Sequence, residues 1–137
     1  KIIIQDIGKS LVATLDTKAY YIKDALILLC KQNFYSLKFI LGIINSKLLN
    51  YYYRKTFITL SVAKNAFLSL PIHSIVNSQS ETKENCESII INVEKVIKIK
   101  NEDNKSDTSE LESRIDNLVY NIYGITDEEI EIIEGSI

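Results

Sequence analysis

Short apolar runs alternate with polar breaks over the first thirty residues, a pattern typical of β-strands joined by turns. The run IIIQDI is rich in β-branched residues, and Val12 with Thr14 favours a second strand. A third apolar run lies between Tyr20 and Cys30. We therefore predict two or three strands before residue 31, with turns near residues 8–10 and 16–19.

The apolar period changes after Ser36. Apolar side chains then recur every three to four residues, which is the spacing of one helical face, and Ser36 is well placed as an N-cap. This pattern predicts a helix from Leu37 to Arg54 that is apolar almost all round and is therefore buried against a sheet. The following segment, 56–72, is again strand-like, and Pro71 ends that predicted strand.

The last part of the chain is predicted to be helical. A long helix is expected from Thr82 to Lys100, and residues 101–108 have no apolar side chain, which indicates a loop. Three local signals shape the rest: Ser109 with Glu112 as a capping box, Gly124 as a left-handed C-cap, and Thr126 with Glu129 as a second capping box. The elements together predict an α+β fold, a small β-sheet with a packed long helix, followed by a C-terminal helical pair and a short last helix.

Charge divides the chain more clearly than its net value of −2 indicates. Residues 1–71 carry ten Lys and Arg against three acids, a balance of +7, whereas residues 72–137 carry six against fifteen, a balance of −9. Such asymmetry favours a polyanion partner for the basic half. We therefore predict a basic domain at residues 1–76, with nucleic acid as the suspected partner, and an acidic helical region at residues 77–137; an unevenly charged solvated surface is the alternative.

Composition excludes several classes of protein. One histidine cannot build a multi-histidine metal site, and Cys30 and Cys86 lack disulfide or metal-pair spacing, so we expect buried thiols in a reducing bacterial cytoplasm. The longest uninterrupted apolar run, Ala25 to Cys30, is too short to span a membrane. No nucleophile, base and orienting group can be assembled, so we expect no enzymatic activity in this chain. It begins KIII and has no methionine, which indicates a fragment of a longer product.

Specific DNA binding needs cations on phosphates and polar side chains aimed at base edges. The basic half offers thirteen candidates: Lys9, Ser10, Lys18, Tyr20, Tyr21, Lys23, Asn45, Lys47, Arg54, Lys55, Thr56, Lys64 and Asn65.

Several of these candidates have an equally ordinary structural explanation. Arg54 can pair with guanine or phosphate, or can simply be a cation favoured at a helix C-terminus. Asn65 suits a turn as well as an adenine. The run Tyr51 to Tyr53 is expected to place one ring in the core and two on its rim, with stacking on a base as the alternative. Asp116 and Tyr120, one helical turn apart, are expected to be structural.

Four strings in the chain resemble a known family in the family's own order. They are KIIIQDIGKSLVATLD (1–16), LKFILGIINSKLLNYYYRKTF (37–57), LSLPI (68–72) and IDNLVYNIYGITDEEIEIIE (115–134). The chain thereby resembles the TaqI-like C-terminal specificity domain of restriction-modification enzymes that fuse a methyltransferase to an endonuclease. Between Phe57 and Phe67 it is shorter than the family pattern, in a loop that is a candidate reader of bases.

The resemblance implies that residues 1–76 are the double-stranded DNA target-recognition domain of a type IIG-like enzyme that methylates adenine N6, with cleavage as an open possibility. The catalytic motif of that family needs two adjacent prolines, and Pro71 is the only proline. We therefore expect no cofactor in this fragment and place S-adenosylmethionine, with Mg as a second candidate, in upstream domains of the parent enzyme. Two alternatives stay open: the recognition half of a type I specificity subunit, and a helical protein-interaction module without DNA binding.

Overall fold

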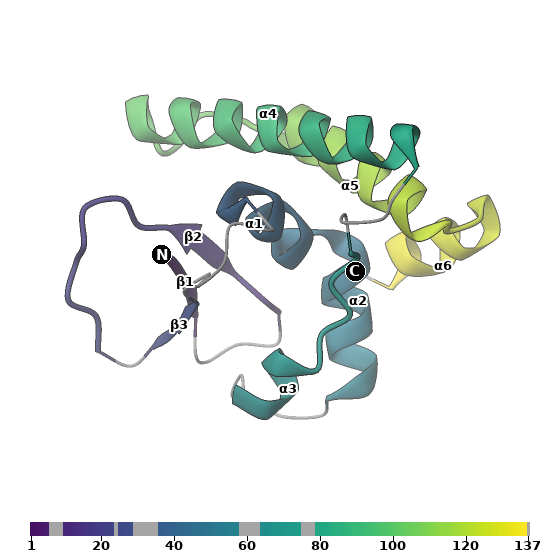
Figure 1. Cartoon of the computed structure of the whole chain (residues 1–137), viewed down its shortest axis with the longest axis horizontal. Coiled ribbons are helices and arrows are strands. Elements are labelled where there is room, and N and C mark those ends of the chain that lie inside the picture. Colours follow the sequence, from purple (N-terminus) through teal and green to yellow (C-terminus); the bar gives the residue numbers. More distant parts are fainter. Residues whose placement is uncertain (6–9, 24, 29–35, 58–63, 75–78, 137) are drawn as a thin grey trace.

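Three short strands form an antiparallel sheet at one end of the molecule (Figure 1). The computed structural model describes residues 1–5, 10–23, 25–28, 36–57, 64–74 and 79–136. The strands are β1 (Ile2–Gln5), β2 (Ala13–Leu15) and β3 (Ala25–Leu28), in the order β2-β1-β3. Ile2 pairs with Leu15 on one side and with Leu28 on the other. Side chains along β1 alternate in burial, with Ile2 and Ile4 fully buried, so the predicted strands are confirmed.

The predicted single helix from Leu37 to Arg54 is wrong, because two helices meet at Ser46. They are α1 (Leu37–Asn45) and α2 (Lys47–Thr56). Ser46 has an extended backbone, and its buried hydroxyl accepts a hydrogen bond from the amide of Leu49 and donates one to the carbonyl of Ile43. It thus ends α1 and N-caps α2. The apolar period runs on across this residue, so periodicity alone did not reveal the break.

The N-cap predicted at Ser36 is confirmed, because its hydroxyl accepts from the amide of Lys38 at 3.2 Å. The strand predicted up to Pro71 is wrong over its described part. Residues 64–68 form a short helix, α3 (Lys64–Leu68), and residues 58–63 lie outside the described part. Ala66 and Leu70, four positions apart, are both buried while Leu68 is exposed, which is a helical pattern.

Two long antiparallel helices cover the other side of the molecule, α4 (Ser80–Glu102) and α5 (Ser109–Tyr123), as predicted (Figure 1). The capping box predicted at Ser109 is wrong, because Thr108 occupies the N-cap position and makes no side-chain cap hydrogen bond. The Thr108 hydroxyl donates to the Glu112 carboxylate at 2.6 Å, and the Asp107 carboxylate accepts from the amide of Ser109. Helix α5 therefore begins without a capping box.

The signals at the C-terminal end are confirmed. Gly124 ends α5 with φ 65° and ψ 35°, a left-handed conformation that favours glycine. Thr126 and Glu129 form a complete capping box at the start of α6 (Asp127–Gly135).

Helix α1 lies between the sheet and the helical pair and supplies much of the core (Figure 1). Phe39, Ile43 and Ile44 are buried on it. A Cβ at Gly42 would lie 2.7 Å from Cγ2 of Ile89, so glycine permits the close approach of α1 to α4. One apolar cluster extends from β1 to α5, in an α+β fold. The domain boundary predicted after residue 76 stays a prediction, and side chains from both ranges share this cluster.

Candidate nucleic-acid interface

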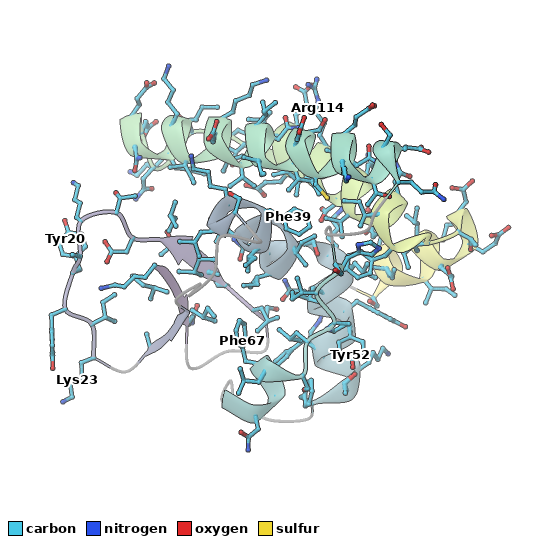
Figure 2. The ribbon with its side chains drawn as sticks, in the orientation of Figure 1. Tyr20, Lys23, Phe39, Tyr52, Phe67 and Arg114 are labelled. Carbon is cyan, nitrogen blue, oxygen red and sulfur yellow. The ribbon has the colours of Figure 1, made fainter. Side chains whose placement is uncertain are left out.

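The connection from β2 to β3 carries four of the predicted DNA-binding residues on its outer surface. Lys18, Lys23 and Tyr20 are exposed, Tyr20 by 59% of its surface, and Tyr21 is fully exposed. Figure 2 shows that Tyr20 and Lys23 point outward at the end of the molecule that lies farthest from α6. The sequence prediction therefore finds two cations and two aromatic rings on one projecting loop, which we call the β2–β3 loop (residues 16–23).

A buried carboxylate orders the β2–β3 loop. Asp16 accepts hydrogen bonds from the backbone amides of Lys18 at 2.9 Å and Tyr20 at 3.0 Å, and its Oδ2 lies 3.0 Å from Nζ of Lys1. Nζ of Lys1 also donates to the Tyr20 carbonyl. Burial acts to raise the pKa of the Asp16 carboxyl, but Lys1 and the two backbone amides together hold that pKa below its usual range. Sequence reasoning missed this anchor, for which an Asp followed by polar turn residues was the available signal.

A second group of predicted residues lies at the C-terminal end of α2 and on α3. Arg54 is half-buried, whereas Lys55, Thr56 and Asn65 are exposed. Nζ of Lys55 lies 5.6 Å from the centroid of the Tyr51 ring, within the range of a cation–π interaction. Lys64 begins α3, and its side chain lies outside the described part. The helices α2 and α3 that carry these residues lie apart from the β2–β3 loop (Figure 1).

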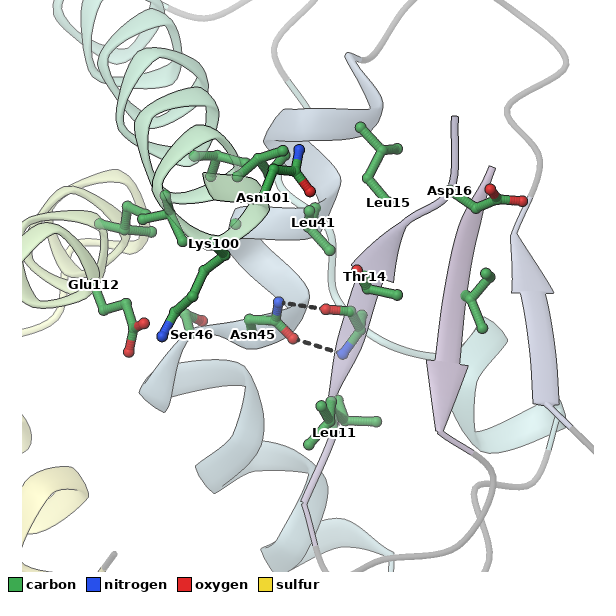
Figure 3. Close-up of a pocket in the computed structure, with 18 of the residues that line it drawn as sticks. Leu11, Thr14, Leu15, Asp16, Leu41, Asn45, Ser46, Lys100, Asn101 and Glu112 are labelled. Carbon is green, nitrogen blue, oxygen red and sulfur yellow. Dashed lines mark hydrogen bonds between the residues drawn. The ribbon is translucent and has the colours of Figure 1, made fainter. Parts of the chain in front are cut away.

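Asn45 and Lys47 are engaged within the fold. The Asn45 amide accepts from the backbone N–H of Ala13 at 2.8 Å and donates to its carbonyl at 2.9 Å, so it replaces a neighbouring strand at the edge of β2 (Figure 3). Asn50 accepts from the amide of Leu11 at 2.7 Å on the same edge. This edge pairing could not be predicted from local sequence patterns, because it joins residues more than thirty positions apart.

The remaining predictions for this half divide in the same way. Nζ of Lys47 lies 3.0 Å from Oε1 of Glu134 on α6. Ser10 is half-buried, and Lys9 lies outside the described part. The tyrosine run is confirmed as one core ring and two rim rings, since Tyr53 is fully buried while its two neighbours are half-buried or exposed.

An open groove of about 1140 Å³ lies between β2, α1 and the helical pair (Figure 3). Lys47, Lys100, Glu112 and Asp116 contribute charges of both signs to its lining. The Asp116 carboxylate is buried and accepts from the backbone amide of Lys47 at 2.9 Å, so it caps the start of α2 from another helix. Burial raises the pKa of this carboxyl, although Lys47 partly offsets that effect. This contact joins α5 to α2.

Neither a metal site nor a reactive thiol is found among the described residues. None of them forms a group of three or more His, Cys, Asp or Glu side chains that could hold a metal ion. Cys86 is a buried free thiol, as predicted, and burial raises its pKa, which suppresses the reactive thiolate. Cys30 lies outside the described part.

Acidic side chains gather at the opposite end of the chain from the β2–β3 loop. Exposed carboxylates occupy α6 throughout: Asp127, Glu128, Glu129, Glu131 and Glu134. Figure 1 shows α6 and the β2–β3 loop at opposite sides of the molecule. Among the described residues, the β2–β3 loop and the acidic helix α6 are therefore separated in space as well as in sequence, and the loop is the one of the two that suits a polyanion.

Comparison with known proteins identifies the basic half. The model of the TaqI-like C-terminal specificity domain matches residues 1–75, more than half of the chain, and confirms the resemblance. No significant match was found among curated proteins or solved structures. Within the described residues, no helix combines the length and apolarity needed to cross a bilayer. Specificity domains of this kind recognise DNA for restriction-modification enzymes and are not themselves catalytic. The chain belongs to the family of TaqI-like C-terminal specificity domains.

Proposed function

We propose that this chain recognises a specific double-stranded DNA sequence for a bacterial enzyme that methylates adenine N6 at that site. The observation that carries the proposal is the β2–β3 loop, which presents two lysines and two tyrosines to solvent within the family-matched range. Cations there would contact phosphates and fix the register of the protein on DNA. A second part of the proposal is that the parent enzyme also cleaves DNA, which the family resemblance alone supports.

We assign the reading of bases to polar residues on α2 and α3. Arg54, Thr56 and Asn65 supply a guanidinium, a hydroxyl and an amide, which are the groups that form hydrogen bonds with base edges in the major groove. The amide of Asn45 is occupied by Ala13, and Lys47 is paired with Glu134, so we leave both out of the contact surface. Recognition then uses two separate surfaces, one on phosphates and one on bases.

We place the chemistry in upstream domains of the parent enzyme, together with S-adenosylmethionine and any Mg that the reaction needs. Support comes from the sequence, which has one proline and four scattered glycines and so lacks both the proline pair of the catalytic motif and a glycine-rich cofactor loop. The acidic helices α5 and α6 would repel DNA and are available to pack on those domains.

The test is binding of the full chain to a randomised duplex pool, measured by fluorescence anisotropy at several salt concentrations with sequencing of the bound fraction. Each phosphate contact contributes about −0.9 to the slope of log K against log salt. The double variant Lys18→Ala with Lys23→Ala should therefore reduce the slope by about 1.8. The matched control is Lys83→Ala with Lys95→Ala, two exposed lysines on α4, which should leave the slope unchanged.

Three outcomes decide between the readings. Enrichment of a short motif together with the slope change supports the proposal. Salt-dependent binding without enrichment assigns base readout to the upstream domains, and the absence of any duplex binding overturns the proposal and favours the protein-interaction module.

A further inference from the structure

Tyr20 and Tyr21, which we call the aromatic tip, are exposed to an extent that folding does not explain. Tyr20 is 59% exposed and Tyr21 is fully exposed. Among the large hydrophobic side chains of the described residues, Tyr21 has the highest exposure. A ring left in water forfeits the free energy of burying its apolar surface, and here two consecutive residues both do so. A partner that covers aromatic rings would account for their position.

The backbone beneath the aromatic tip is held in a strained conformation. Ala19 has φ 56°, in the left-handed region that is unfavourable for a residue with a Cβ. The amide of Tyr20 is fixed by Asp16 and its carbonyl by Nζ of Lys1. Strain of this kind persists where surrounding contacts over-determine the backbone, and it is concentrated at functional sites.

Charge identifies the kind of partner. Lys18 and Lys23 are exposed on either side of the aromatic tip, and the Asp16 carboxylate between them and the sheet is buried and paired with Lys1. The solvent side of the loop is therefore cationic and aromatic. A nucleic acid matches this combination, because its phosphates pair with the lysines and its bases stack on the rings. An acidic protein surface would pair with the lysines but would leave the rings without a stacking partner.

We propose that the aromatic tip is a wedge that inserts against a base step of duplex DNA and partly unstacks it, with Lys18 and Lys23 on the flanking phosphates and Asp16 as the positioning residue. This inference rests on the proposed function and adds to it a deformation of the DNA. Unstacking a base step costs free energy, so a ring that is held in place before binding is better suited to the task than a mobile one. Flexible pyrimidine–purine steps, which unstack most easily, should be preferred.

The experiment uses the full chain and a randomised duplex pool in which 2-aminopurine, whose fluorescence rises on unstacking, replaces part of the adenine. We expect the fluorescence to rise on binding to the wild-type chain. The variant Tyr20→Ala with Tyr21→Ala should abolish the rise and weaken affinity by roughly 5- to 150-fold, the range for one lost stacking contact. Tyr20→Phe with Tyr21→Phe should retain both, because the rings are kept.

Two further variants complete the design. Asp16→Asn has one acceptor oxygen for two amides, so it should reduce the fluorescence rise while the salt slope set by the lysines stays unchanged; circular dichroism confirms that it is folded. Ile132→Ala, which removes an equally exposed apolar side chain from α6, is the control and should behave as wild type.

The outcomes separate this inference from the function on which it rests. Wild-type binding without a fluorescence rise, or an equal rise with the alanine pair, overturns the wedge and leaves DNA recognition intact. Absence of wild-type binding overturns both.

Discussion

Removing the amide of Asn45 should destabilise the sheet without touching the DNA-binding surface. In Asn45→Ala, the backbone N–H and carbonyl of Ala13 each lose the partner that now closes the edge of β2 (Figure 3). Only 9% of the surface of Ala13 is exposed, so water replaces these hydrogen bonds poorly. The change also uncovers an edge strand, which is a site of intermolecular pairing.

The magnitude follows from two hydrogen bonds. Each contributes a net of about 0.5–1.5 kcal/mol, so the loss is about 2 kcal/mol in total. For a chain of 137 residues, with an unfolding entropy of about 2.1 cal/mol/K per residue, this loss lowers Tm by about 7 °C. Asn65→Ala is the matched control, because Asn65 is exposed on α3; its Tm should stay within about 2 °C of wild type.

A third variant tests the geometry itself. In Asn45→Asp one oxygen still accepts from the amide of Ala13, but the other faces the Ala13 carbonyl, and two acceptors repel each other. At neutral pH the variant should melt at least as low as Asn45→Ala. Below a pH of about 3.9 the carboxyl is protonated and can donate, so its deficit relative to wild type should shrink.

Thermal unfolding followed by circular dichroism from pH 3 to 7 measures all three variants. DNA binding is then compared at a temperature where each remains folded, and Asn45→Ala should bind as wild type does. Equal Tm values for wild type and Asn45→Ala would refute the edge-pairing argument, and lost binding in a folded Asn45→Ala protein would return Asn45 to the contact surface.

Three further predictions test the helix junctions. Asp116→Asn keeps an acceptor for the amide of Lys47 but cannot ionise; because burial raises the Asp116 pKa above its ordinary 3.8, the wild-type stability from this group is complete below that pH and is lost as pH rises through the folded-state value. The free energy of unfolding of the variant minus that of wild type should therefore increase from pH 3 to 7 in urea titrations, and parallel curves would contradict this. Thr126→Ala should cost about 1 kcal/mol by losing the capping box, whereas Ser109→Ala should cost under about 0.5 kcal/mol in the same titration, and equal costs would place a cap at Ser109 after all. Gly124→Ala should cost about 1–2 kcal/mol in thermal unfolding for its φ of 65° alone, since a Cβ there meets no atom within 4 Å, and an unchanged Tm would show that the backbone relaxes.

Local chemistry made parts of the fold predictable. The strands before residue 31, the long helix α4, the glycine at the end of α5 and the capping box of α6 depend on residues within one or two turns of each other, so their signals are complete in the sequence. The basic and acidic halves were also predictable, because net charge is a sum over residues and needs no contacts.

The errors occurred where a distant partner decides the outcome. Ser46 sits in an unbroken apolar period, yet its hydroxyl ends one helix and begins another, and Asp116, far along the chain, caps the second helix from α5. The segment 64–68 carries too few residues for its period to separate helix from strand, and packing of Ala66 and Leu70 on the core decides it. Asn45 was a candidate for DNA by residue type, and only the structure gives its partner.

The DNA-binding candidates divide into residues that the fold itself engages and residues that it leaves exposed, and this division bears on how the target sequence can change. Asn45 and Lys47, on helices that build the core, are held by the fold itself. Lys18, Tyr21 and Lys23 have exposed side chains on a loop whose shape is fixed from below by a buried carboxylate. Substitutions of these three exposed side chains leave Asp16 and the core untouched, so DNA binding can change at little cost in stability. Substitution of Asp16 releases the backbone under both tyrosines at once, and it should therefore reduce the DNA deformation, whereas substitution of Lys18 or Lys23 should alter the salt dependence of binding.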